Sequence, residues 1–177
     1  MKRKFQKLEF YTLKFIIGIL VYFDGRLYMK FYNKLLQHSG IKINGTPRFI
    51  AKSVRFDDHS RITLGDRLVV SMNVHFLTHD YSYTTALIAN GEMPKTDIGI
   101  LRDIKVGNNV FIGMNSLILP GTEIGDNVIV GAGSVIRGKI QNNSVVSGNP
   151  AKFICSIEEY ALKVKDRTGH DLIIDKK

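Results

Sequence analysis

A period of six residues in the second half of the chain constrains its fold more than any other feature. Written in sixes from Val106, the chain reads VGNNVF, IGMNSL, ILPGTE, IGDNVI, VGAGSV and IRGKIQ. Every first position is Val or Ile, at Val106, Ile112, Ile118, Ile124, Val130 and Ile136. A helix would scatter positions six apart around its axis, whereas short strands joined by turns place them at equivalent inward sites. The repeat therefore predicts stacked coils that share one core.

Turn residues and phase changes extend this pattern. The pairs Asn108-Asn109 and Asp126-Asn127 stand between the short strands, where they suit backbone with positive φ. Residues 64–76 fit the repeat, and Ile50, Phe56 and Ile62 form a looser earlier set. The pattern fails over residues 78–98, which predicts a loop that leaves the coil. Long loops in repeat folds often carry the binding function.

Composition excludes several classes of protein. With 177 residues, 44% hydrophobic and 23% charged, the chain is neither disordered nor larger than about one domain. A single cysteine, Cys155, excludes a disulfide framework. The formal charge of +9 is concentrated in residues 1–42, where nine basic and two acidic residues give +7. Because residues 43–151 are nearly neutral, we expect no nucleic-acid partner.

The two ends of the chain are expected to be helical. The apolar run over residues 15–23 is too short to span a bilayer, and two helices are predicted over about 5–22 and 25–38. They form either a cap on the main domain or a neighbouring subunit, which we favour, or a peripheral contact of residues 1–38 with an anionic membrane. At the other end, Ser156 and Glu159 form a capping box. It predicts a helix over about 157–167 that closes the coil stack.

The motifs of residues 50–155 resemble those of the hexapeptide-repeat acyltransferases. The most specific match is IGDNVIVGAGSVI followed by NNSVVSGNPAKFI, over residues 124–136 and 142–154. The subgroup is that of the sugar and polysaccharide O-acetyltransferases, similar to maltose, galactoside and capsule acetyltransferases. The resemblance implies an all-β, left-handed parallel β-helix over residues 43–154, with a helical extension over 1–42 and a C-terminal helix and tail over 155–177. It also implies a homotrimer with active sites between subunits.

Acetyl transfer to a sugar hydroxyl needs a base, and histidine suits that role near neutral pH. The candidates are His38, His59, His75, His79 and His170. His79 lies in LTHDY, where the coil gives way to the loop, and the resemblance assigns it the role of base. His75, Asp80 and Tyr81 are expected to contact the acceptor, although Tyr81 stands where many relatives have a second histidine.

The resemblance also implies a site for acetyl-CoA, the acyl donor, and no metal. The matching positions are Gly113, Met114, Gly131, Ala132, Ile136, Arg137 and Lys152. Small residues would let the backbone approach the pantetheine arm, and the two basic residues would contact the nucleotide end. Alternatively, the glycines serve only to make tight turns.

We therefore expect a cytoplasmic enzyme, peripheral at the inner membrane face if residues 1–38 bind lipid, that acetylates a hydroxyl of a sugar or glycan precursor. Four alternatives remain open. They are a non-enzymatic β-helix scaffold, a zinc enzyme built on His75, His79 and Asp80, an amine acceptor, and Cys155 as a nucleophile.

Overall fold

Short parallel strands wrap into a stack of coils with three sheets as its walls. The computed structural model describes residues 2–167, with side chains from residue 8 onward. The first sheet has the order β1 (Lys42–Ile43), β4 (Ile62–Leu64), β9 (Ile104–Val106), β12 (Glu123–Ile124) and β15 (Lys139–Ile140). The second has the order β2 (Phe49–Ile50), β5 (Val69–Val70), β10 (Phe111–Ile112), β13 (Ile129–Val130) and β16 (Ser144–Gly148). The third has the order β3 (Arg55–Phe56), β6 (His75–Phe76), β11 (Leu117–Ile118) and β14 (Val135–Ile136).

The sequence period sets the register between coils. Phe111 pairs with Ile129, and Leu117 pairs with Val135. The side-chain bond from Lys105 to Glu123 likewise joins residues 18 positions apart, so one coil is three sixes long. All six Val and Ile residues at the first position of each six are at most 3% exposed. The predicted inward sites and the parallel β-helix are thus confirmed.

Asparagines hold the corners of the coils. Asn109, Asn127 and Asn143 have φ values of 53°, 55° and 56°, in the left-handed region. Their side chains form a ladder, in which Asn109 donates to Asn127 at 2.9 Å and Asn127 donates to Asn143 at 2.8 Å. The expectation of positive φ is confirmed for Asn109 and Asn127 but not for Asn108 and Asp126, the first residue of each pair.

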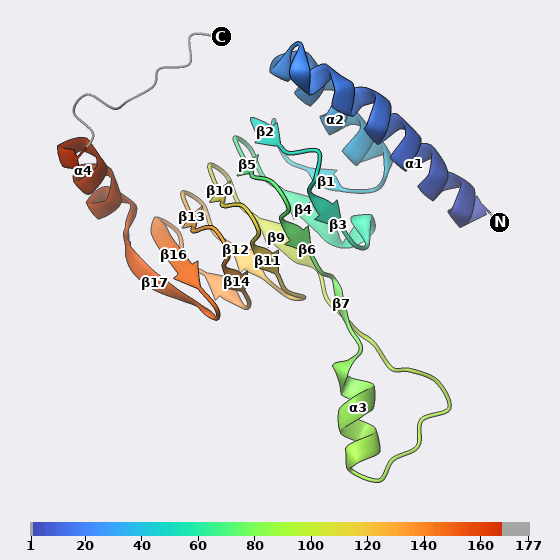
Figure 1. Cartoon of the computed structure of the whole chain (residues 1–177). Coiled ribbons are helices and arrows are strands. Elements are labelled where there is room, and N and C mark those ends of the chain that lie inside the picture. The colour runs from blue at the N-terminus through green and yellow to red at the C-terminus, as the bar shows by residue number, and fades with distance from the viewer. Residues whose placement is uncertain (1, 168–177) are drawn as a thin grey trace.

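A helical cap covers the N-terminal end of the stack (Figure 1). It consists of α1 (Lys2–Ile19), a 3₁₀ helix (Leu20–Tyr22) and α2 (Gly25–His38). Tyr28, Tyr32 and Leu36 of α2 are almost wholly buried, and the Tyr28 hydroxyl donates to the Ile50 carbonyl at 2.8 Å. The cap on the main domain is confirmed, whereas the label all-β is wrong because helices make up a substantial part of the chain.

The predicted loop over residues 78–98 is an ordered arm that extends away from the stack (Figure 1). Its base is an antiparallel pair of strands, β7 (His79–Asp80) and β8 (Ile100–Leu101). The arm contains the helix α3 (Ser82–Ala89), which the sequence analysis did not predict. The sequence of this helix has almost no amphipathic pattern. In the structure, Thr84 and Leu87 are its buried residues.

A strand, rather than the last helix, covers the open edge at the far end of the second sheet. β17 (Ala151–Ser156) pairs antiparallel with β16. The helix α4 (Ile157–Arg167) follows, and its capping box is present: Glu159 N donates to Ser156 Oγ at 3.1 Å and Ser156 N to Glu159 Oε2 at 3.3 Å. However, α4 has no buried residue, so the prediction that it closes the stack is wrong.

None of the helices within residues 2–167 has the length and apolar character needed to cross a membrane.

We predict that Asn127→Ala lowers the free energy of unfolding by about 2–3 kcal/mol, because it removes two ladder bonds and places a Cβ-bearing residue without local bonds at positive φ. Asn127→Gly loses the same bonds but adopts positive φ freely, so it should cost about 1 kcal/mol less. Urea denaturation at one fixed protein concentration measures both. Equal losses in the two variants would contradict this account of the corners.

Candidate functional site

His79 is held by a carboxylate from the preceding coil. Its Nδ1 lies 2.8 Å from Oδ2 of Asp57, and the imidazole is 40% exposed. The same carboxylate accepts a bond from Thr78 N at 3.3 Å, and Thr78 Oγ1 in turn accepts from Asp58 N at 3.2 Å. These bonds join the residues after β3 to those after β6, so coil stacking itself positions Asp57 beside the imidazole.

The pair fixes which nitrogen of His79 is available for chemistry. A neutral imidazole that donates from Nδ1 to a carboxylate keeps the lone pair on Nε2. Within residues 2–167, no hydrogen-bond partner occupies that Nε2. The arrangement can therefore accept a proton from a ligand at the base of the arm.

Asp80 has a different task. Its carboxylate accepts from Ser82 N at 2.8 Å and so begins α3. Hydrogen bonds from Ser82, and then the nearby charge of Arg137, hold the pKa of Asp80 below its usual range. Tyr81 packs its ring against His79, with 5.4 Å between ring centroids. Of the predicted acceptor-binding residues, Tyr81 is thus the one that contacts the imidazole directly.

His75 lies in β6 and belongs to the outer face of the third sheet. The strand register aligns it with Arg55 of the coil before and Leu117 of the coil after. Burial, and then the charge of Arg55, lower the pKa of His75, so its imidazole is neutral near pH 7. Along this face of the third sheet, Arg55 lies nearest the cap, His75 comes next, and the apolar Leu117 follows.

A cavity of about 810 Å³ lies between α1 and the first two coils. Phe10, Tyr11 and Lys14 line it from the helix, and Arg55, Asp57 and His75 are among those that line it from the coils. Asp57 therefore belongs both to this cavity and to the pair with His79.

The residues expected to bind the donor lie mostly at another corner. Gly113 and Met114 follow β10, and Gly131 and Ala132 occupy the same corner one coil later, where Gly133 N donates to the Met114 carbonyl at 2.8 Å. A Cβ at Gly113 would lie 2.5 Å from Ala132 N, so tight stacking alone already requires this glycine.

The three other residues predicted to bind the donor differ in how exposed their side chains are. Arg137 and Lys152 present exposed cations. The Ile136 side chain is fully buried in the core, so a ligand could touch only its backbone. One protomer does not bring the corner of Gly113 to His79, because a strand of the third sheet separates the two corners.

The other residues considered for the base or for a nucleophile lie away from His79. His38 is exposed at the end of α2, and His59 packs against Phe10 with ring centroids 4.8 Å apart. His170 is outside the described residues. Cys155 is buried in β17, which is no place for a nucleophile. Between residues 2 and 167, no group of three His, Cys, Asp or Glu side chains could hold a metal ion.

Sequence reasoning missed Asp57, Lys14 and Arg55. A usable signal exists for Asp57, since its neighbour Phe56 belongs to the looser, earlier set of inward residues. Continuing the coil register from Phe56 to Phe76 puts Asp57 next to the segment that carries His79. Lys14 reaches the cavity from the helical cap, which the repeat does not describe.

Comparison with known proteins places this geometry in a family. The pattern of the bacterial transferase hexapeptide family (six repeats) matches residues 103–138. Protein CapG of Staphylococcus aureus is 37% identical over 133 residues, which are 74% of this chain and 74% of that protein. Galactoside O-acetyltransferase of Escherichia coli is 37% identical over 103 residues, but they cover 58% of this chain and 47% of that protein.

A solved structure shares the fold. The hexapeptide-repeat-containing acetyltransferase of Vibrio cholerae superposes with a TM-score of 0.60 at 22% identity, and the match covers 89% of this chain and 93% of that one. The same enzyme has also been solved with acetyl coenzyme A, with a TM-score of 0.52 to this chain.

We predict that Asp57→Ala abolishes the single tautomer of His79, since the carboxylate that accepts from Nδ1 is lost. Long-range ¹H–¹⁵N correlation spectra of the imidazole should show one tautomer in the wild type and a mixture in the variant. Asp80→Ala is the matched control, because it removes the neighbouring carboxylate but leaves the pair intact. A spectrum of Asp57→Ala that is identical to the wild type would contradict the assignment.

Proposed function

Because this chain belongs to the hexapeptide-repeat acyltransferase family, we propose that it transfers the acetyl group of acetyl-CoA to a hydroxyl of a sugar or glycan precursor. The observation that carries the proposal is the Asp57–His79 pair at the base of the arm. It supplies what acyl transfer to a hydroxyl needs, an imidazole whose Nδ1 is held by a carboxylate so that Nε2 is left to accept a proton.

In this mechanism His79 acts as the general base. Its Nε2 takes the proton of the acceptor hydroxyl while the oxygen attacks the thioester carbonyl. The tetrahedral intermediate then collapses, the C–S bond breaks, and the imidazolium returns the proton to the leaving thiolate. Asp57 positions the ring and stabilises the imidazolium. No acyl-enzyme forms, which agrees with the burial of Cys155.

Acetyl-CoA is the donor in this proposal. The exposed side chains of Met114 and Ala132 and the backbone of Gly113 and Gly131 offer a narrow corner for the pantetheine arm. Arg137 and Lys152 supply cations for its phosphates. The acetyl-CoA complex of the related Vibrio cholerae fold supports this donor for the family.

A homotrimer of left-handed β-helices would complete the site. In one protomer the donor corner and His79 are separated, so a neighbouring chain is needed to bring a donor to the imidazole. The projecting arm also exposes large apolar side chains, which mark protein interfaces; they are Tyr83, Ile88, Met93, Ile98 and Leu101.

We predict that His79→Ala lowers kcat for thiol release from acetyl-CoA by at least 100-fold, because the base is removed. Sedimentation should still give the mass of a trimer, and coenzyme A should still raise the melting temperature as in the wild type. His38→Ala, which changes an exposed histidine far along α2, serves as the control. Wild-type turnover in His79→Ala would reject this base, and a monomeric wild type would reject the shared site.

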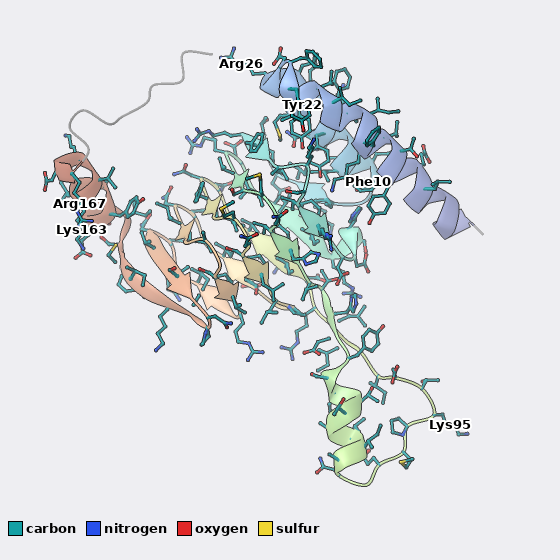
Figure 2. All side chains as sticks on the ribbon, viewed as in Figure 1. Phe10, Tyr22, Arg26, Lys95, Lys163 and Arg167 are labelled. Atoms are coloured by element: carbon teal, nitrogen blue, oxygen red, sulfur yellow. The ribbon has the colours of Figure 1, made fainter. Side chains whose placement is uncertain are left out.

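We also propose that the cytoplasmic enzyme rests on an anionic membrane through the outer face of its cap. That face consists of large apolar side chains, each at least 46% exposed: Leu8, Phe15, Ile16, Ile19 and Phe23. Arg26, Lys30 and Lys34 add exposed cations four residues apart on α2. Tyr22 and Arg26 lie together at the outer end of the α1–α2 hairpin (Figure 2). Aromatic side chains beside cations are typical of helices that lie on anionic lipid.

We predict that the protein co-sediments with vesicles containing 30% phosphatidylglycerol, and that Phe23→Asp reduces the bound fraction at least threefold by placing a charge on this face. Leu162→Asp is the control, because it places the same charge on an apolar side chain of α4 that is 63% exposed and has no part in the cap or the arm. Equal binding by both variants, or no binding by the wild type, would contradict the membrane contact.

A further inference from the structure

The cavity next to Asp57 carries an excess of positive charge. Lys14 reaches it from α1, and Lys52 and Arg55 line it from the first coil. Asp57 is its one acidic side chain, and that carboxylate is already engaged by His79. A surface that gathers three cations around a single committed carboxylate is suited to an anion.

None of the three cations has a carboxylate partner among the side chains of residues 8–167. Lys14 Nζ donates to the Val54 carbonyl at 2.8 Å. Lys52 Nζ donates to the Tyr22 hydroxyl at 2.7 Å and lies 4.3 Å from the centre of that ring. These partners are neutral. By contrast, Arg61 and Lys105, which lie outside the cavity, do pair with carboxylates.

The environment of Lys14 makes the lack of a counter-charge costly. Burial, and then repulsion from Arg55, lower the pKa of Lys14 to about 8. A neighbouring anion would offset both effects and stabilise the ammonium. The neutral His75, which stands beside Arg55 in the strand register, adds a hydrogen-bonding group on the same wall.

We infer that this cavity binds an anionic group, a carboxylate or phosphate, on the acceptor sugar. The inference rests on the proposed function, because it makes the cavity the acceptor side of the site whose base is His79. Asp57 forms part of the cavity wall and holds the imidazole, so an acceptor anchored by Arg55, Lys52 and Lys14 lies next to the Asp57–His79 pair. A neutral sugar would leave these cations unpaired.

The test compares the binding of three monosaccharides to the full-length wild type by calorimetry. Glucuronic acid and glucose 6-phosphate are the charged probes, and glucose is the neutral one. We expect at least one charged probe to bind tenfold or more tightly than glucose. Which of the two is preferred identifies carboxylate or phosphate as the group. Equal affinity for all three sugars, or no heat from any of them, would overturn the inference.

The charge preference should depend on the cavity cations. In Arg55→Gln we expect it to fall to threefold or less, with an unchanged melting temperature since Arg55 is exposed. Lys105→Gln is the matched control, because it removes an exposed cation on the first sheet that is paired with Glu123. A preference that survives in a Lys52→Gln, Arg55→Gln double variant would overturn the proposed site.

Two further experiments distinguish this inference from binding of the donor phosphates and from the proposed function itself. The titration is repeated with saturating coenzyme A; displacement of the charged sugar would mean that the cations serve the donor phosphates, and the inference would be wrong. It is also repeated with His79→Ala, which should keep the preference while losing transfer. A wild type that binds charged sugars but releases no thiol with any acceptor would refute the proposed function and leave the anion site intact.

Discussion

The register between coils is the constraint on which the rest of the molecule depends. Inward Val and Ile residues stack from one coil to the next, and so do the corner asparagines, so burial and the corner hydrogen bonds favour the same alignment. A slip of one residue would turn the buried side chains toward solvent and break the asparagine ladder at once. Because both penalties act together, residues far apart in the chain are fixed as neighbours, and Asp57 meets His79 in this way.

What could be predicted from the sequence follows from this register. Positions that repeat, such as Ile112, Ile118 and Asn127, report their environment directly through their spacing. Features that occur once do not. The helix α3 has no clear amphipathic pattern, and β17 comes after the last six-residue repeat and does not continue the period. Neither element could therefore be predicted from the spacing of residues. The base at His79 came from family resemblance, which no amount of periodicity would supply.

Packing and ligand binding make overlapping demands on the same small residues. Gly113 cannot carry a Cβ because the next coil lies against it, whether or not a pantetheine arm binds nearby. Its identity is therefore weak support for a donor site. Arg137 and Lys152 are more informative, since exposed cations have no role in coil stacking. The same reasoning gives Asp57 its weight, because a part-exposed carboxylate bound to an imidazole contributes little to the core.

The cap links the chemistry to the rest of the molecule through a single helix. One side of α1 contributes Phe10 and Lys14 to the cavity, while Phe15 and Ile16 face outward. Because α1 contributes side chains to the cavity on one side and exposes apolar side chains on the other, its sequence is constrained on both sides. A helix that only covered the stack would need apolar residues on one side alone. In the proposed mechanism the repeats provide His79 as the base, and the cap contributes Lys14 to the cavity proposed for the acceptor.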